Sequence, residues 1–322
     1  MPEVQADAYQ EFIKGLGIIF CRYFNKSEQG MRVKDRYLNP FTDFGFKKLF
    51  GVEPNKDILI DFLNELLRKD EGKIKDITYL SPEQLGRTIG ERKAIFDIYC
   101  ENEQGEKFIV EMQKAKQNYF KDRSIYYSTF PIQSQAQKGG WGFELKSVYT
   151  VGILDFVFDE DKSSDQVFHH EVQLFDKSVQ KVFYDKLTYI YLEMPKFKKT
   201  IGELETHFDK WLYVLKNLEN LTDKPTKLQE RIFTKLFEQA EIANFDDDEY
   251  SEYEESLKTY RDLKNSFDTA REEGRREGRE EGRKEGGKEE KITIAGKLKR
   301  QNIPPEIICR STGLPIEEIE KL

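Results

Sequence analysis

The sequence of 322 residues has few cysteines and no long apolar run. Its three cysteines, Cys21, Cys100 and Cys309, are odd in number and share no metal-ligand spacing, which argues against a disulfide framework and a zinc site. No stretch approaches the roughly 20 apolar residues of a transmembrane helix, and the start lacks a basic head followed by an apolar block. We therefore expect no signal peptide, no membrane association and a cytoplasmic location.

Basic residues are also fewer than acidic ones, 52 against 60, which gives a formal net charge of −8. Proteins that coat nucleic acid through their overall field depend on lysine and arginine contacts to phosphate, so this composition disfavours tight nonspecific DNA binding. It leaves room for a local basic groove, because negative charge is concentrated in runs such as Asp246 to Glu249.

The most informative stretch is an expected β-hairpin between Glu91 and Ala115. Its side chains alternate, with Ala94, Phe96, Ile98 and Cys100 predicted on one face and Ile95, Asp97 and Tyr99 on the other; Phe108, Val110 and Met112 repeat the pattern against Ile109, Glu111 and Gln113. Asp97, Glu111 and Gln113 are therefore all predicted to leave the apolar face.

The turn decides which residues meet across this hairpin. A three-residue Glu103–Gly105 loop, with glycine in the left-handed conformation, would pair Asn102 with Glu106 and place Asp97 opposite Glu111. A two-residue turn would pair Asp97 with Met112 instead and destroy the site. We favour the three-residue loop.

Two carboxylates so placed have β-carbons roughly 5 Å apart and destabilise the sheet unless their charge is neutralised. A hard divalent cation does this, since Mg²⁺ takes carboxylate oxygens at about 2.1 Å. The alternative is that each carboxylate pairs with Lys93, Lys107 or Lys114 on an exposed face, and spacing alone does not separate the two interpretations.

The order of these residues resembles a known family. An Asp on one strand, Glu-x-Gln on the next and a Tyr-rich helix afterwards is similar to the PD-(D/E)XK nucleases, and in particular to the bacterial PD-(D/E)XK nuclease family transposases, also called recombination-promoting nucleases. Three more stretches carry the resemblance: NPFTDFGFKKLFG at Asn39 to Gly51, DFLNELL at Asp61 to Leu67, and RSIYYSTFPIQSQAQKGG at Arg123 to Gly140.

The resemblance implies an α/β fold, with a restriction-endonuclease-like central mixed sheet flanked by helices and a helical C-terminal part. It also implies a metal-dependent DNA endonuclease linked to transposition or recombination, with DNA as partner and Mg²⁺ or Mn²⁺ as cofactor. The alternative is a catalytically weak module of the same fold that binds DNA or self-associates.

The resemblance also assigns roles to residues. Asp97, Glu111 and the main-chain carbonyl of Met112 would hold the metal, Asp43 would assist, and Gln113 would orient water or phosphate where the superfamily name has lysine. Lys47, Arg123 and Gln135 are candidate DNA contacts, and Arg123 and Gln135 could touch the site instead. A second Glu-x-Gln, Glu171 to Gln173, follows Asp155 by sixteen residues and is an internal rival, which we set aside because no family motifs flank it.

Other elements follow from periodicity and end signals. We expect helices at Asp43 to Phe50, Lys56 to Arg68, Tyr119 to Lys138, Glu203 to Leu221, Pro225 to Asn244 and Asp248 to Ala270. Thr42 is the expected N-cap of the first helix, and Pro131 should kink or break the third. We expect an edge strand at Ile74 to Leu80 and further strands at Ser147 to Phe158, Val167 to Phe175 and Thr188 to Met194.

The expected domain order is an N-terminal extension (1–30), a nuclease core (31–200), a helical subdomain (201–270), a Glu/Arg/Gly-rich linker (271–290) and a small helical C-terminal element (291–322). The linker has glycine at 274, 278, 282 and 286, and each costs about 1 kcal/mol in a helix relative to alanine. We expect it to be flexible or conditionally helical, or else to pair helices through its glycine stripe. The tail is the expected place for homo-oligomerisation.

Overall fold

The computed structural model describes residues 35–67, 73–84, 94–136, 142–158 and 167–322. The expected N-terminal extension lies outside the described residues. The chain forms two compact units, the first ending at Tyr260 and the second beginning at Arg261.

The first unit is built on a six-stranded sheet with the order β1-β4-β5-β6-β8-β7. These strands are β1 (Ile77–Tyr79), β4 (Ile98–Asn102), β5 (Lys107–Gln113), β6 (Val148–Leu154), β7 (His169–Asp176) and β8 (Lys181–Glu193), and a separate pair joins β2 (Glu83–Gln84) to β3 (Ala94–Ile95). Strands β5, β6 and β8 run parallel, whereas β1, β4 and β7 pair antiparallel with their neighbours. The expected central mixed sheet is confirmed, and β1 is an edge strand shorter than expected.

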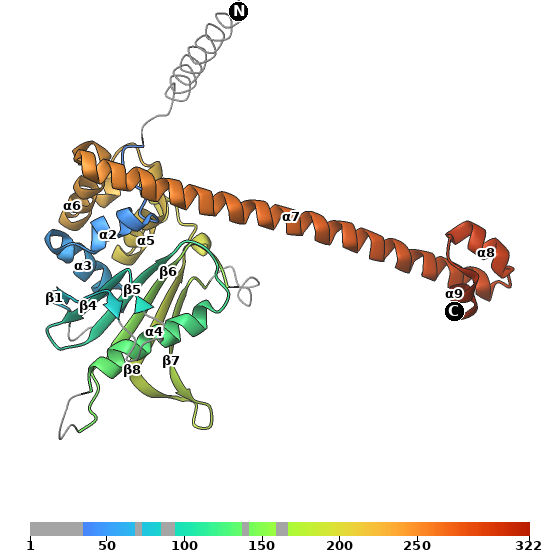
Figure 1. Ribbon diagram of the computed structural model, residues 1–322, viewed down its shortest axis with the longest axis horizontal. Coiled ribbons are helices and arrows are strands. Elements are labelled where there is room, and N and C mark those ends of the chain that lie inside the picture. The colour runs from blue at the N-terminus through green and yellow to red at the C-terminus, as the bar shows by residue number, and fades with distance from the viewer. Residues whose placement is uncertain (1–34, 68–72, 85–93, 137–141, 159–166) are drawn as a thin grey trace, which may run out of the picture. The chain divides into compact units, whose positions relative to one another are not determined.

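Helices cover both faces of this sheet (Figure 1). One face carries α2 (Asp43–Phe50), α3 (Lys56–Leu67), α5 (His207–Asn217) and α6 (Arg231–Ala240), and the other carries α4 (Phe120–Ser134). Every residue of β6 is buried between these layers, which explains its unbroken run of apolar and β-branched residues.

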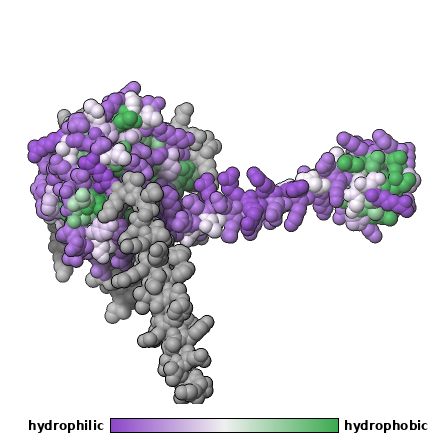
Figure 2. Space-filling model, turned by 90° about the horizontal axis from the view of Figure 1, so that it is seen from above, coloured by the Kyte–Doolittle hydropathy of each residue, from purple (hydrophilic) through white to green (hydrophobic). Residues whose placement is uncertain are grey.

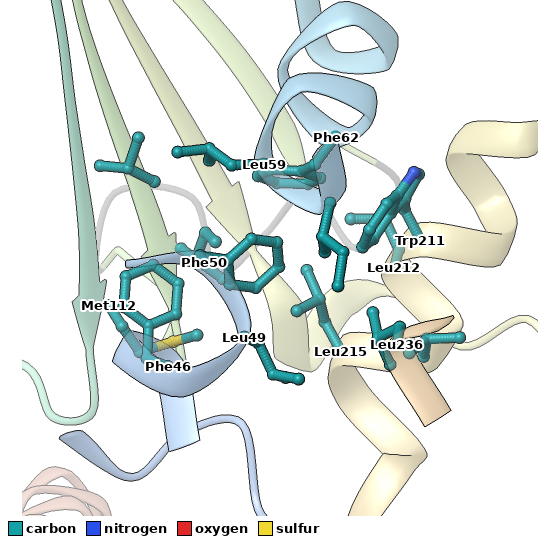
Figure 3. Packing of buried hydrophobic residues seen from close by; sticks show 14 of the residues in the cluster. Phe46, Leu49, Phe50, Leu59, Phe62, Met112, Trp211, Leu212, Leu215 and Leu236 are labelled. Atoms are coloured by element: carbon teal, nitrogen blue, oxygen red, sulfur yellow. The ribbon is translucent and has the colours of Figure 1, made fainter. Parts of the chain in front are cut away.

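The main core lies between the sheet and the larger helical layer. Figure 3 shows how aromatic and aliphatic side chains from α2, α3, α5, α6 and β5 interlock there: Phe46, Leu49, Phe50, Leu59, Phe62, Met112, Trp211, Leu212, Leu215 and Leu236. The Phe50 and Trp211 ring centroids lie 6.0 Å apart, so residues distant in sequence pack α2 against α5.

Helix α2 begins where the sequence predicts. The Thr42 hydroxyl accepts a hydrogen bond from the Gly45 N–H at 3.0 Å, and Gly51 closes the helix by donating to the Lys47 carbonyl at 2.7 Å. A β-carbon on Gly45 would lie 2.3 Å from the Asn39 carbonyl oxygen, so glycine is required at that position.

The predicted alternation fails at one place in the hairpin. Ala94 and Phe96 pack with Tyr99 and Ile109 under α4, not with Ile98 and Cys100 in the main core. The chain bends at Asp97, because the Phe96 N–H bonds the Pro82 carbonyl at 3.0 Å and β3 pairs with β2 outside the main sheet. The single strand expected from Arg92 to Glu101 is therefore two strands separated by this bend.

Two helices end away from their expected limits. Helix α4 contains Pro131 without breaking there and ends at Ser134. The helix expected to stop at Ala270 continues as α7 (Asp247–Arg300), so its expected end is wrong. The side chains from Arg271 to Glu290 are almost all exposed, and apolar periodicity therefore could not reveal this continuation.

The second unit ends in two short helices, α8 (Pro305–Thr312) and α9 (Ile316–Glu320), as expected around a glycine turn. Gly313 adopts the left-handed conformation at φ 71°. A small core of Ala295, Ile308, Leu314 and Ile319 holds this element together. Figure 2 shows hydrophobic residues on its surface. Ile307 in α8 is 52% exposed.

Candidate active site

The β4–β5 hairpin has the register that the three-residue turn predicts. Asn102 donates its N–H to the Glu106 carbonyl at 3.1 Å, and Gly105 has φ 77°. Ile98 pairs with Val110, so the next position outward sets Asp97 opposite Glu111. The bend that interrupts the strand therefore occurs at the first carboxylate.

Direct hydrogen bonds hold the two carboxylates together. The Met112 N–H donates to Asp97 Oδ2 at 2.7 Å, and the Asp97 N–H donates to Glu111 Oε1 at 3.3 Å. Each carboxylate is thus fixed by the backbone of the other strand.

Burial makes this pair costly to ionise. Desolvation, and secondarily the Asp97 carboxylate, raises the pKa of Glu111 to about 8. Desolvation and then the Asp43 carboxylate raise the pKa of Asp97, against the opposing effects of the Met112 N–H, Lys47 and Lys114. Two adjacent carboxylates with raised pKa values form an environment that a divalent cation would stabilise.

The Met112 carbonyl is directed toward the same edge. The N–H and C=O of one residue in an extended strand point to the same neighbouring strand, and the Met112 N–H points at Asp97. The structure therefore assembles two carboxylates and a main-chain carbonyl, all oxygen donors of the kind that Mg²⁺ and Mn²⁺ prefer.

Gln113 and Arg123 meet beside Glu111. The Gln113 amide donates from Nε2 to the Ala115 carbonyl at 2.8 Å and accepts at Oε1 from Arg123 Nη2. The Arg123 charge lowers the pKa of Glu111, opposing the burial effect. Arg123 therefore lies at the carboxylate site, which is one of the two places that the resemblance left open for it.

Asp43 and Lys47 approach the site from α2, and Lys47 Nζ lies 3.0 Å from Asp43 Oδ2. Burial lowers the pKa of Lys114, while Asp43 and Asp97 raise it. An open pocket of about 680 Å³ is lined by Asp43, Lys47, Lys114 and the first turns of α7. Lys47 and Lys114, whose charges lower the pKa of Asp97, thus line an accessible surface.

Asp43 does not join the pair as a third close carboxylate. Within the described ranges, no three Asp, Glu, His or Cys side chains are grouped so that they could hold a metal ion. The metal site implied by the sequence accordingly depends on Asp97, Glu111 and the main-chain carbonyl.

Gln135 lies away from these residues. Its side chain accepts from the Lys146 N–H at 2.7 Å and donates to the Pro131 carbonyl at 3.2 Å. The carbonyl of Ser147, which follows Lys146, accepts a hydrogen bond from the Lys107 N–H at the start of β5, whereas Gln113 is at the end of that strand.

The rival Glu-x-Gln does not form a comparable site. Glu171 is exposed on the edge strand β7 and pairs with Ile190, which pairs with Val151. Asp155 lies beyond the end of β6 and accepts a hydrogen bond from the Tyr260 hydroxyl at 3.2 Å. The strand pairing therefore separates Asp155 from Glu171.

Sequence reasoning missed two polar residues beside Glu111. Burial raises the pKa of Tyr127 on α4, and so does the Glu111 charge. Thr150 on β6 has a buried hydroxyl without a hydrogen-bond partner among the described residues, and it lines a cavity of about 10 Å³ with Glu111 and Arg123. A threonine in a β-branched strand carries no distinguishing signal.

A comparison with protein families decides the assignment. A family model described as PD-(D/E)XK nuclease family transposase matches residues 40–270. The chain belongs to this family. Searches of curated proteins and of solved structures found no match.

The PD-(D/E)XK match spans the whole sheet, the flanking helices and the Asp97–Glu111 pair. It supports a nuclease- or transposase-type function, and PD-(D/E)XK nucleases generally use divalent metals. None of the described helices combines the length and apolarity needed to cross a membrane.

Proposed function

We propose that this member of the PD-(D/E)XK nuclease family transposases is a Mg²⁺- or Mn²⁺-dependent endonuclease that hydrolyses DNA phosphodiesters during transposition or recombination. The observation that carries the proposal is the Asp97–Glu111 pair, in which hydrogen bonds place two carboxylates together although burial disfavours their ionisation.

The oxygen donors fit such a metal. Asp97, Glu111 and the Met112 carbonyl would hold it, and Asp43 would assist from α2. When bound, the metal lowers the pKa of a coordinated water and offsets negative charge on the phosphate. The Met112 N–H keeps Asp97 in its orientation at 2.7 Å.

The remaining residues position the substrate. Gln113 carries a neutral amide that cannot take a proton near pH 7, so its part is to orient its neighbours. Lys47 and Lys114 present positive charge at the open pocket, where a DNA phosphate can approach. The carboxylates of Asp43, Glu249, Glu252 and Glu255 line the same pocket, so a phosphate contact there depends on individual lysines and not on a net positive surface.

Cleavage of supercoiled plasmid in Mg²⁺ tests the proposal. We expect wild-type protein to nick the plasmid and Asp97→Asn, which keeps an oxygen acceptor for the Met112 N–H, to lose on the order of 1,000-fold in rate. Asp185→Asn is the matched control, because Asp185 is exposed on β8.

Equal nicking by wild type and Asp97→Asn would refute the proposal and indicate a contaminating nuclease. DNA binding without cleavage in either metal would favour the alternative, a binding module with this fold.

A further inference from the structure

The candidate site contains a cation, Arg123, that is not one of the proposed metal ligands. Arg123 stands in the first turn of α4, where its N–H bonds the Tyr119 carbonyl at 2.9 Å. Its guanidinium carbon lies 5.3 Å from the Phe120 ring centroid and 5.7 Å from that of Tyr127. These aromatic rings fix the guanidinium beside β5.

The polar partners of Arg123 are neutral. Nη2 donates to Gln113 Oε1, and Nη1 donates to Gln117 Oε1. Within the part of the chain that the structure describes, Arg123 forms no ion pair with a carboxylate. Amide oxygens orient a guanidinium without cancelling its charge, and further N–H donors remain for an anion.

The Gln113 amide has a fixed orientation. Its Nε2 is engaged by the Ala115 carbonyl, so Oε1 must face Arg123. Gln113 is 9% exposed, which leaves little freedom for another rotamer. One hydrogen bond joins the two side chains, and the Arg123 charge therefore lies within a few ångströms of the end of the Gln113 side chain.

The name of the PD-(D/E)XK superfamily has a lysine where this chain has Gln113. We propose that Arg123 supplies the positive charge missing from that position by contacting the scissile phosphate, and that Gln113 is the residue that positions Arg123. Arginine stays protonated, so Arg123 stabilises negative charge and does not act as a base. This role rests on the proposed nuclease function.

Exchanging the cation between the two positions tests the assignment. Arg123→Ala should lower the single-turnover nicking rate on the order of 100-fold, as expected for loss of one charge-stabilising donor group. Gln113→Lys in the Arg123→Ala background should recover roughly tenfold or more, because it returns a cation to the same place. Lys177→Ala, which removes one charge from the exposed β7–β8 turn, should cut at the wild-type rate.

The rescue separates a charge role from a structural one. If Arg123 only supported packing, Gln113→Lys would restore nothing, and that result would overturn the proposal. Wild-type nicking by Arg123→Ala would overturn it as well. Thermal melting of each variant identifies any loss caused by unfolding, and Arg123→Lys provides a second variant that retains the charge.

A binding measurement keeps the inference independent of cleavage. With a short DNA duplex in Ca²⁺, Arg123→Ala should reduce the slope of log affinity against log salt by about one, as expected for a lost phosphate contact. A wild-type protein that never cuts DNA would refute the proposed function, whereas an unchanged slope for Arg123→Ala would refute the phosphate contact.

Discussion

The chain contains the tripeptide Glu-x-Gln on two strands of one sheet, with different surroundings. On β5, Glu111 faces Asp97, and Gln113 bonds a guanidinium. On β7, Glu171 is exposed, and Gln173 donates to the Thr188 hydroxyl at 2.9 Å. The same residue types form a candidate site only on β5, where burial raises the pKa of Glu111 and a second carboxylate lies opposite it.

The largest expected difference between the two strands is in cleavage. Glu111→Gln should lower the plasmid nicking rate on the order of 1,000-fold, because it removes one of two charged metal ligands. Glu171→Gln should leave the rate unchanged. Parallel nicking assays in Mg²⁺ check both, and loss of nicking in Glu171→Gln with retention in Glu111→Gln would reverse the assignment.

Metal binding should stabilise the protein through β5 alone. A ligand at about 100 times its Kd adds roughly 2.7 kcal/mol to the unfolding free energy. We expect Mn²⁺ to raise the melting temperature of wild type and of Glu171→Gln by several degrees, and that of Glu111→Gln much less. A shift of equal size in all three proteins would place the metal elsewhere.

The pH dependence of stability should show a smaller difference. Folding raises the pKa of Glu111 from 4.5 to about 8, so the metal-free folded state binds the proton more tightly and loses stability as pH rises through that range. Between about pH 6 and 8 this loss amounts to ~2 kcal/mol. In urea unfolding without metal, the unfolding free energy of Glu111→Gln should therefore rise relative to that of wild type as pH increases. The unfolding free energy of Glu171→Gln should follow that of wild type. If the unfolding free energies of all three proteins changed with pH in parallel, folding would not raise the pKa of Glu111.

Local signals in the sequence were sufficient for the turn of the hairpin and for the start of α2. Gly105 predicts the turn, the turn predicts the register, and Thr42 predicts the start of α2. Each of these depends on residues within a few positions of one another, where backbone preferences decide the structure.

The sequence was less informative where the local structure depends on contacts between residues far apart in the chain. The bend at Asp97 depends on the Pro82 carbonyl, and the Arg123–Gln113 contact depends on how α4 packs across the sheet. The length of α7 was missed for another reason, since an exposed Glu/Arg/Gly helix has no apolar side to reveal it.

The three-residue turn makes the active centre sensitive to insertions and deletions. A change in the length of the Glu103–Gly105 loop that slipped one strand by one residue would move the side chains of that strand to the other face. A longer loop that absorbs the extra residues would leave every facing pair in place. Over evolutionary time this loop should therefore accept changes in length only in forms that preserve the strand pairing, and position 105 should keep glycine because its φ is 77°.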